Sequence, residues 1–442
     1  MRITSPPAGD PAGLSLVDAA AAIRRGELSP VALTEACLAR IEDHDRELRS
    51  FITVTRDSAL LQASRAATEI AAGAYRGPLH GIPVALKDLV DTAGVRTTAG
   101  SGVFERRVPD TDAAVVRRLR EAGAVLVGKT NLHEFAFGST GLISRFGATC
   151  NPLDTGRIAG GSSSGSAASV AAHMCCAAVG TDTAGSLRLP AACCGVVALK
   201  PTYGAVDAVG VIPLSPSLDH VGPIARTARD AALLLGALLG DTIDLEPAGT
   251  PLRIGIAREL FFEEIEAKVA RAMEAAIRCC SRVASLRDVR VPAVSADRTV
   301  FNHEVWRYHQ LLVRDHAADY QERTLRRVQR TEGVTAEQYA RALEELLASR
   351  AAVGEVFADV DVILTPTSPV AAPTLDALEE PDELRRYERV LLRNTAPFNA
   401  LGVPALTLPT AEPFVGLQLC AAPGEESRLL AIAVQMEGIL GE

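Results

Sequence analysis

The chain has 442 residues, of which 48% are hydrophobic and 22% are charged, and its formal net charge at pH 7 is −9. This length can bury a large core, and an acidic balance without a basic run argues against a nucleic-acid partner. No apolar run near the start is typical of a signal peptide, and no later run is long enough to span a bilayer. We therefore expect a cytoplasmic protein that binds neither nucleic acid nor membrane.

Nine cysteines include three adjacent pairs, at residues 175–176, 193–194 and 279–280. An odd number of cysteines with neighbours side by side is not typical of a secreted disulfide framework. No CxxC motif occurs and the histidines are scattered, so we predict no metal site and no cofactor. The cysteines are expected to be small buried residues in a reducing compartment.

The N-terminal third alternates helix and strand patterns. Ser29 followed by Pro30 is typical of a helix start, and apolar residues recur at helical spacing in two further segments. Short apolar runs between the helical segments are typical of buried strands, so the alternation predicts α/β layering. In chain order we expect helices over residues 30–47, 57–72 and 112–122, and strands over residues 82–86 and 124–127.

Residues 167–179 are almost all Ala, Ser, Val or Cys, which predicts a helix enclosed on every side. Two runs of small residues flank it, at 160–166 (GGSSSGS) and 180–186 (GTDTAGS), so such a helix would hold serines at both ends. The alternative for residues 160–166 is a flexible linker, but a linker normally joins polar surfaces and does not enter a buried helix.

The C-terminal half begins with a predicted strand over residues 254–257, followed by long helical stretches rich in Arg and Glu. Strands are predicted again over residues 360–365 and 404–409. No internal repeat or interdomain linker is evident. We therefore expect one domain over residues 1–442, with about 245–355 as a helical insertion.

Lys87 ends an apolar run in a chain that contains only four lysines. Burial among apolar residues penalises the ammonium and lowers the pKa of a lysine, and a neutral amine is a competent base near neutral pH. The alternative is a lysine that snorkels to solvent or pairs with Asp88 or Asp91. The local sequence leaves both interpretations open.

Ser186 follows Thr183, Ala184 and Gly185, whose small side chains let several backbone N–H groups converge on one point. Such donors stabilise a tetrahedral oxyanion, and losing one typically costs ~3–4 kcal/mol of barrier. The alternative is an ordinary tight turn before a strand-like segment at residues 187–189.

Ser162 is placed to pass a proton from Ser186 to Lys87. A nucleophilic hydroxyl, a relay hydroxyl and a desolvated lysine together break an acyl bond without histidine. The pattern therefore indicates a serine hydrolase of amide-type bonds.

Several separate segments resemble the amidase signature family, in the order in which that family carries them. They are residues 81–88 (GIPVALKD), 97–101 (TTAGS), 128–131 (GKTN), 160–202, 217–223 (SLDHVGP) and, more loosely, 364–366 and 394–404. Residues of about 245–355 show no such similarity.

The resemblance implies a mixed, mostly central β-sheet covered by helices on both faces, and a Ser–cis-Ser–Lys triad. In that triad Ser186 is the nucleophile, Ser162 is the relay that follows a cis peptide bond, and Lys87 is the base. Many members have glycine where this chain has Ala184 and Ser164, but neither change removes a catalytic group. The backbone amides of the implied oxyanion hole are those of Thr183, Ala184, Gly185 and Ser186.

Two other interpretations compete with this triad. Residues 161–165 (GSSSG) match the nucleophile elbow of α/β-hydrolases, with Ser163 as nucleophile. An elbow requires a preceding strand and a late histidine, whereas residues 154–158 are polar and look irregular, and the last histidine is His316. A non-catalytic binding protein on an amidase scaffold is the second alternative, and the presence of all three triad residues argues against it.

Within the family, the glutaminase subunit of the glutamyl-tRNA amidotransferase releases ammonia from glutamine for a partner protein. The chain is short for that branch, and residues 393–399 (RNTAPFN) carry asparagine where its glutamine-binding aspartate is expected. Residues 140–144 are also more apolar than that branch's equivalent. We therefore favour a stand-alone amidase, and the alternative is the glutaminase of the amidotransferase. Urethane-cleaving members are similar in length and triad spacing, and although other branches share that spacing, we keep carbamate hydrolysis among the expected activities.

The substrate pocket is expected to draw on residues 98–104 and 135–142 and on the helices over 302–320, within the insertion. Aromatic residues in these segments suit a small apolar or aromatic amide, anilide or carbamate. Arg188 is expected to support the nucleophile loop rather than bind a carboxylate. A homo-oligomer remains open.

Overall fold

The computed structural model describes residues 2–246, 252–292 and 298–440. Its strands are β1 (Phe51–Val54), β2 (Pro83–Lys87), β3 (Val125–Thr130), β4 (Cys150–Asn151), β5 (Asp154–Ile158), β6 (Ala177–Asp182), β7 (Val197–Lys200), β8 (His220–Ala225), β9 (Leu252–Ile256), β10 (Ala284–Asp288), β11 (Val362–Pro366), β12 (Ala405–Pro409) and β13 (Gly416–Cys420). All but β4 and β5 form one 11-stranded sheet, in the order β1-β3-β2-β6-β8-β7-β12-β13-β11-β9-β10.

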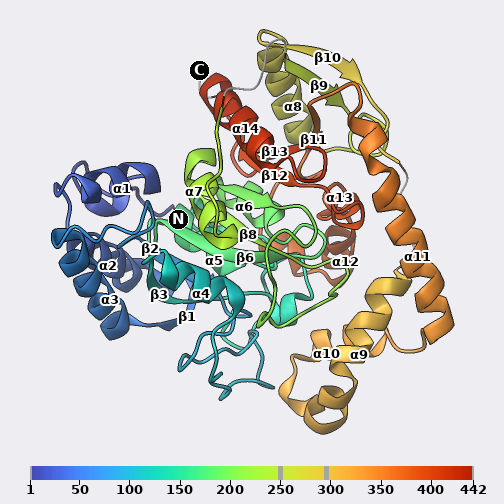
Figure 1. The fold of residues 1–442 in the computed structure, drawn as a ribbon. Helices are drawn as coiled ribbons and strands as arrows, with labels where there is room; N and C mark the ends of the chain where they lie inside the picture. The colour runs from blue at the N-terminus through green and yellow to red at the C-terminus, as the bar shows by residue number, and fades with distance from the viewer. Residues whose placement is uncertain (1, 247–251, 293–297, 441–442) are drawn as a thin grey trace.

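The helices are α1 (Leu16–Arg24), α2 (Pro30–Leu48), α3 (Arg56–Ala71), α4 (Ala114–Glu121), α5 (Ser164–Ala171), α6 (Arg188–Cys194), α7 (Ala228–Leu239), α8 (Ala267–Cys280), α9 (Thr299–His316), α10 (Glu322–Gln329), α11 (Ala336–Ala352), α12 (Pro381–Val390), α13 (Ala396–Ala400) and α14 (Glu426–Leu440). They surround the sheet on both faces, and α9, α10 and α11 extend to one side of it (Figure 1). Within the described residues, no helix has the length and apolar character needed to cross a bilayer.

The sheet is mixed. Strands β3, β2 and β6 run parallel, as do β11, β9 and β10, and the remaining neighbours pair antiparallel. The α/β fold with a mixed central sheet covered on both faces, which the sequence and its resemblance predict, is therefore confirmed.

Strand β2 shows how the sheet positions a functional side chain. Val84 and Leu86 belong to the core cluster that contains α7 and α14 residues, whereas Ala85 packs in the opposite cluster with Ala167 of α5. Because successive strand residues point to opposite faces, Lys87 follows Ala85 onto the α5 face.

Most predicted elements of the N-terminal third agree with the structure within about two residues. One prediction is wrong: the helix expected over 167–179 ends at Ala171, and β6 begins at Ala177. Between them the chain turns at His173, whose φ is +58°. A short apolar run such as residues 175–179 suits a buried strand as well as a buried helix, so periodicity could not separate the two.

Three further segments differ from the sequence-based expectations. The strand-like residues 187–189 open helix α6, and the segment 154–158, expected to be irregular, is strand β5, which pairs with β4. The stretch of about 245–355 contains the expected strand over 254–257, observed as β9, and an unexpected strand, β10; β9 pairs with β11 in the main sheet, and β10 pairs with β9. All nine cysteines are free thiols.

We predict that Gly165→Ala severely destabilises the fold. A Cβ at Gly165 would lie 2.2 Å from the Ser50 carbonyl oxygen and 2.5 Å from the Asn131 nitrogen, because α5 meets backbone directly at this point. Overpacking of a rigid core costs ~1–3 kcal/mol or more, and backbone atoms cannot give way as a side chain can. Urea unfolding measures the loss. Gly438→Ala, where nothing lies within 4 Å of the added carbon, is the control and should be neutral or slightly stabilising.

Candidate active site

Lys87 lies at the C-terminal end of β2 and is fully buried. Its Nζ donates hydrogen bonds of 2.8 Å to Ser162 Oγ and 2.8 Å to Thr181 Oγ1. It makes no ion pair with Asp88 or Asp91: Asp88 lies 3.5 Å from Lys129 Nζ, and Asp91 pairs with Arg107. The alternative of a surface lysine or one paired with these two carboxylates is therefore wrong.

Ser162 stands just before α5, and the Gly161–Ser162 peptide bond is cis, as the resemblance implies. The Ser162 carbonyl accepts from the His133 amide at 3.1 Å, and the Gly161 amide donates to Ser139 O at 2.7 Å. The segment 133–139 thus fixes the backbone on both sides of this bond. Gly161 has no room for a side chain, because an added Cβ would lie 2.7 Å from the Gly141 nitrogen.

Ser186 follows β6 in a loop that returns toward Ser162. The Ser163 amide donates to Ser186 O at 3.3 Å, so the two serine-containing segments are joined next to the Lys87–Ser162 hydrogen bond. The three predicted triad residues are thereby gathered at the ends of β2 and β6 and at the start of α5. The Ser163 hydroxyl points elsewhere and donates to Thr181 O, which does not suit the exposed nucleophile of an elbow.

One predicted oxyanion donor needs correction. The Gly185 amide donates to Asp182 Oδ1 at 2.6 Å, and the carbonyl of the same peptide, Ala184 O, accepts from Thr395 Oγ1 at 2.6 Å. The peptide is held at both ends, so its N–H does not face an oxyanion. Among the described amides of residues 183–187, those of Thr183, Ala184 and Ser186 remain without a hydrogen-bond partner.

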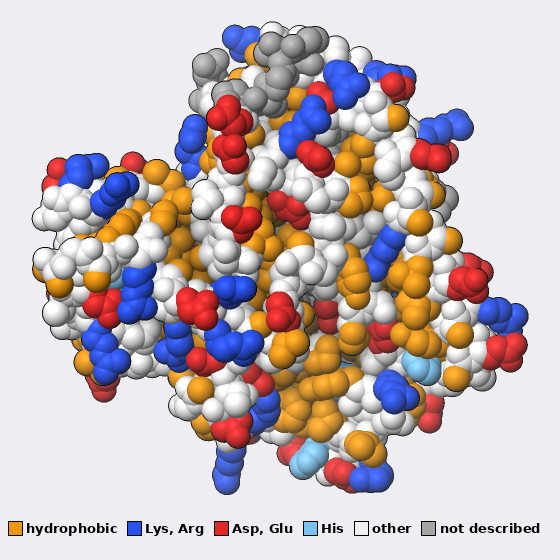
Figure 2. Space-filling model, in the orientation of Figure 1, with side chains coloured by type: hydrophobic (Ala, Val, Ile, Leu, Met, Phe, Trp, Pro, Cys, Tyr) orange, Lys and Arg blue, Asp and Glu red, His pale blue; other side chains and the backbone are white. Residues whose placement is uncertain are grey.

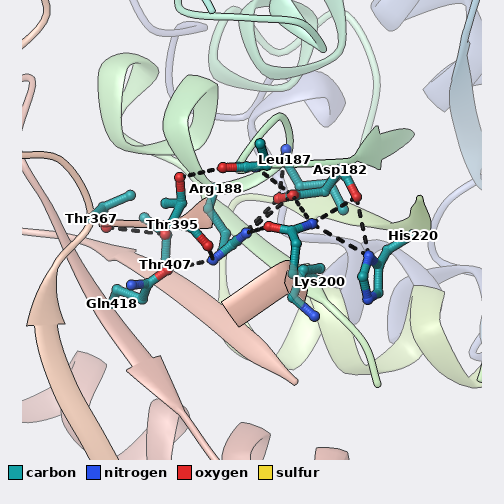
Figure 3. Close-up of polar contacts among 12 residues, drawn as sticks. Asp182, Leu187, Arg188, Lys200, His220, Thr367, Thr395, Thr407 and Gln418 are labelled. Atoms are coloured by element: carbon teal, nitrogen blue, oxygen red, sulfur yellow. Dashed lines mark hydrogen bonds and ion pairs between the residues drawn. The ribbon is translucent and has the colours of Figure 1, made fainter. Parts of the chain in front are cut away.

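Asp182 and Arg188 form a fully buried ion pair beneath this loop, with Nε–Oδ2 at 3.0 Å. The Leu187 amide and Asn399 Nδ2 also donate to the Asp182 carboxylate, and Arg188 extends on its other side to Gln418 Oε1 at 2.7 Å (Figure 3). Burial opposes ionisation of Asp182, yet Arg188 and the other donors hold the pKa of its carboxyl well below its usual value. Arg188 is fully buried beneath the loop that carries Ser186, and its guanidinium is taken up by Asp182 and its neighbours, which agrees with the supporting role expected from the sequence.

The charge state of Lys87 follows from its surroundings. Burial lowers the pKa of Lys87 to about 7, and the carboxylates of Asp182 and Asp219 act in the opposite direction. An amine with this pKa is neutral in a large fraction of molecules at neutral pH, and a neutral amine accepts a proton. Burial also raises the pKa of Asp219 to about 6.

A cavity of about 340 Å³ lies beside Thr181, which accepts a hydrogen bond from Lys87; Lys87, Ser162 and Ser186 are not among its lining residues. It reaches Thr181, Thr183 and Asp219, and most of its remaining lining is apolar: Leu89, Ala136, Ala208, Val209, Val211, Ile212, Pro213, Leu214, Pro216 and Val221. Figure 2 shows hydrophobic side chains gathered in the lower centre of one face of the molecule. The volume suits a small molecule with an apolar part.

The loop over residues 207–216 supplies much of this lining, and it was not expected from the sequence. The sequence pattern that could have indicated this loop is a run of Val, Ile, Pro and Leu in a segment too rich in glycine and proline for a helix. Of the three segments expected to line the pocket, 135–142 contributes Ala136, whereas 98–104 and 302–320 contribute no lining residue to this cavity. Aromatic residues of all three pack together instead, for example Phe104 against Phe135 and Phe135 against Tyr320.

The two asparagines of residues 393–399 are structural. Asn394 Nδ2 donates to the carbonyls of Phe261 and Pro366, and Asn399 Nδ2 donates to Asp182. Neither is among the residues that line the cavity. Among the described residues, no group of three or more His, Cys, Asp or Glu is arranged to hold a metal ion.

Comparisons with known proteins agree on one family. A family model described as Amidase matches residues 32–430. A protein of Carboxydothermus hydrogenoformans, named as a subunit of the glutamyl-tRNA(Gln) amidotransferase, is 36% identical over 463 residues. The match covers 94% of this chain and 95% of that protein.

Solved structures are also similar over nearly the whole chain. A crystal structure described as an amidase has a TM-score of 0.89 and 33% identity, and covers 97% of this chain and 100% of its own. The corresponding protein of the Thermotoga maritima glutamyl-tRNA(Gln) amidotransferase has a TM-score of 0.78 and 30% identity, covering 98% of this chain and 95% of its own.

We predict that kcat/KM falls as pH drops through about 7, because protonation of Lys87 removes the base. The decline due to Lys87 should approach about tenfold per pH unit well below that pKa, and protonation of Asp219 near pH 6 should steepen it. The measurement is kcat/KM between pH 5 and 9.5, with intrinsic fluorescence confirming the folded state at each pH. Lys87→Met should remain folded and lose about 10²–10⁴-fold in rate. A profile that is flat across this interval would contradict a role for Lys87 as the base.

We predict that Arg188→Met destabilises the protein by about 3–5 kcal/mol, because it leaves the Asp182 carboxylate buried without its cation. The free energy of unfolding in urea measures this loss. Arg278→Met is the control, since Arg278 is exposed and lies 4.0 Å from Glu274. Equal stability of the two variants would mean that the buried pair does not hold the loop.

Proposed function

The chain belongs to the amidase family and is an enzyme acting on C–N amide bonds, and we propose that it does so through an acyl-enzyme on Ser186. Ser162 relays the proton and Lys87 is the base. The observation that carries this proposal is the 2.8 Å hydrogen bond between the buried Lys87 Nζ and Ser162 Oγ, beside the loop of Ser186.

The proposed reaction begins with proton transfer along the three residues. Neutral Lys87 takes the hydroxyl proton of Ser162, which takes that of Ser186, and Ser186 Oγ forms a bond to the carbonyl carbon. The carbonyl oxygen becomes an oxyanion, stabilised by the free amides of Thr183, Ala184 and Ser186.

The proton then returns through Ser162 to the leaving nitrogen, and the C–N bond breaks. Water attacks the acyl-enzyme by the same proton path and releases the acid, which regenerates Ser186. No metal or cofactor enters these steps.

Two kinds of C–N bond are candidates. The relatives named as amidotransferase subunits support the first, the side-chain amide of glutamine, with this chain acting beside partner proteins. Such a role requires the zwitterionic head of glutamine to be bound near Ser186.

The cavity supports the second candidate, a small neutral amide, anilide or carbamate. The described residues that line it include Asp207 and Asp219 but neither lysine nor arginine. A free α-carboxylate would meet no cation there, while the apolar lining suits an uncharged group.

We predict that the purified chain hydrolyses members of a matched panel of anilides, primary amides and aryl carbamates, and that Ser186→Ala abolishes this turnover. Ser163→Ala is the matched control and should retain activity, because its hydroxyl bonds only to backbone. Release of the aryl amine or ammonia is measured for each substrate. Free glutamine is included in the same panel.

The pattern of turnover separates the candidates. Anilide or carbamate turnover that disappears in Ser186→Ala identifies a small-molecule amidase, and glutamine turnover alone identifies the amidotransferase role. Turnover that survives in Ser186→Ala but is lost in Ser163→Ala would overturn the assignment of the nucleophile. No turnover of any substrate, together with no labelling by a fluorophosphonate, would favour a binding protein.

A further inference from the structure

A carboxylate outside the triad contacts the oxyanion loop directly. Thr183, whose amide is one of the free donors, donates a hydrogen bond from its side-chain hydroxyl to Asp219 Oδ1 at 2.6 Å. This bond joins the end of β6 to the segment before β8, and Asp219 also lines the cavity. Since Oγ1 and the backbone belong to the same small residue, the bond fixes the direction of the Thr183 peptide.

The Asp219 carboxylate is itself held by its own loop. Its Oδ2 accepts from the amides of Leu214 at 2.9 Å and Ser215 at 3.0 Å, and its backbone N–H donates to Ser215 O at 2.9 Å. Together with Thr183 Oγ1, the two amides give this carboxylate three hydrogen-bond donors. The two amides fix its orientation, so it is a fixed acceptor for the Thr183 hydroxyl.

The helical segment of the chain anchors this loop from outside. Glu304 on α9 accepts from the hydroxyl of Ser215 at 2.5 Å and from the amide of Ser217 at 3.1 Å. From α11, Tyr339 donates to Glu304 at 2.9 Å, and Arg350 donates to Ser217 O at 2.7 Å. The loop is thus tied to α9 and α11.

We propose that Asp219 is a positioning residue that orients the oxyanion loop through Thr183, and that Glu304 transmits the support of α9 and α11 to Asp219. The inference rests on the proposed function, because it assigns a role within the same reaction. Asp219 acts on the transition state through the Thr183 amide, not by contact with the reacting atoms. The helices of residues 299–352 then help to fix the orientation of the oxyanion-hole amides.

The test compares Thr183→Val, which removes the hydroxyl but keeps the shape, with Thr183→Ser, which keeps the hydroxyl. With the best substrate of the panel, Thr183→Val should lose about 10–100-fold in kcat with KM changed less than about threefold. Thr183→Ser should stay within about threefold of wild type. Affinity for phenylboronic acid, which forms a tetrahedral adduct with the nucleophile, should fall by the same factor as kcat/KM in Thr183→Val.

A buried threonine outside the network provides the control. Thr331 donates to Val328 O, and Thr331→Val should lower the melting temperature without lowering kcat. Asp219→Asn and Glu304→Gln should reduce kcat in that order of severity, because the effect passes from Glu304 through Asp219.

Hydrogen exchange gives a readout that needs no substrate. The amides of Gly185 and Leu187, which are hydrogen-bonded to Asp182 within this loop, should exchange faster in Thr183→Val than in Thr183→Ser or wild type. Wild-type kcat in Thr183→Val, a loss confined to KM, or unchanged exchange in this loop would overturn the inference while leaving Ser186 as nucleophile. Absence of turnover in the wild type, with faster exchange in Thr183→Val, would overturn the proposed function alone.

Discussion

The active-site loop depends on the buried ion pair between Asp182 and Arg188. Burying two charges is costly, and the cost is offset only when further hydrogen bonds satisfy both groups. Here the Asp182 carboxylate receives the amides of Gly185 and Leu187, so the charge that pairs with Arg188 also shapes the loop that carries Ser186. The direction in which the remaining loop amides point is therefore a consequence of this pair.

Much of the fold could be predicted because local signals and tertiary packing agree. Ser29 caps α2 as expected, since its hydroxyl accepts the Val31 amide, and the apolar run before Lys87 is indeed a buried strand. The prediction over residues 167–179 was wrong because local signals do not distinguish helix from strand there: small apolar residues suit any buried element. Pairing with the neighbouring strands β2 and β8 selects a strand for residues 177–182.

The candidate site residues could be predicted where the residue type itself indicates the chemistry. Three of the four lysines, at 87, 129 and 200, are fully buried, so their rarity was informative. What could not be predicted depends on contacts between distant segments. The Gly185 amide donates to Asp182 and the Thr183 hydroxyl donates to Asp219, and no local sequence pattern indicates either hydrogen bond. The same holds for the apolar loop that lines the cavity.

The order of strands has a consequence for biosynthesis. Strands β12 and β13 come late in the chain but lie in the middle of the sheet, between β7 and β11, and Gln418 of β13 holds Arg188. Non-local pairing of this kind forms only once both partners exist. A nascent chain on the ribosome that has not yet exposed residues 405–420 lacks two inner strands of its sheet and Gln418, which holds Arg188 beneath the loop of Ser186. The loop that carries Ser186 therefore gains its full support only after residues 405–420 have been synthesised.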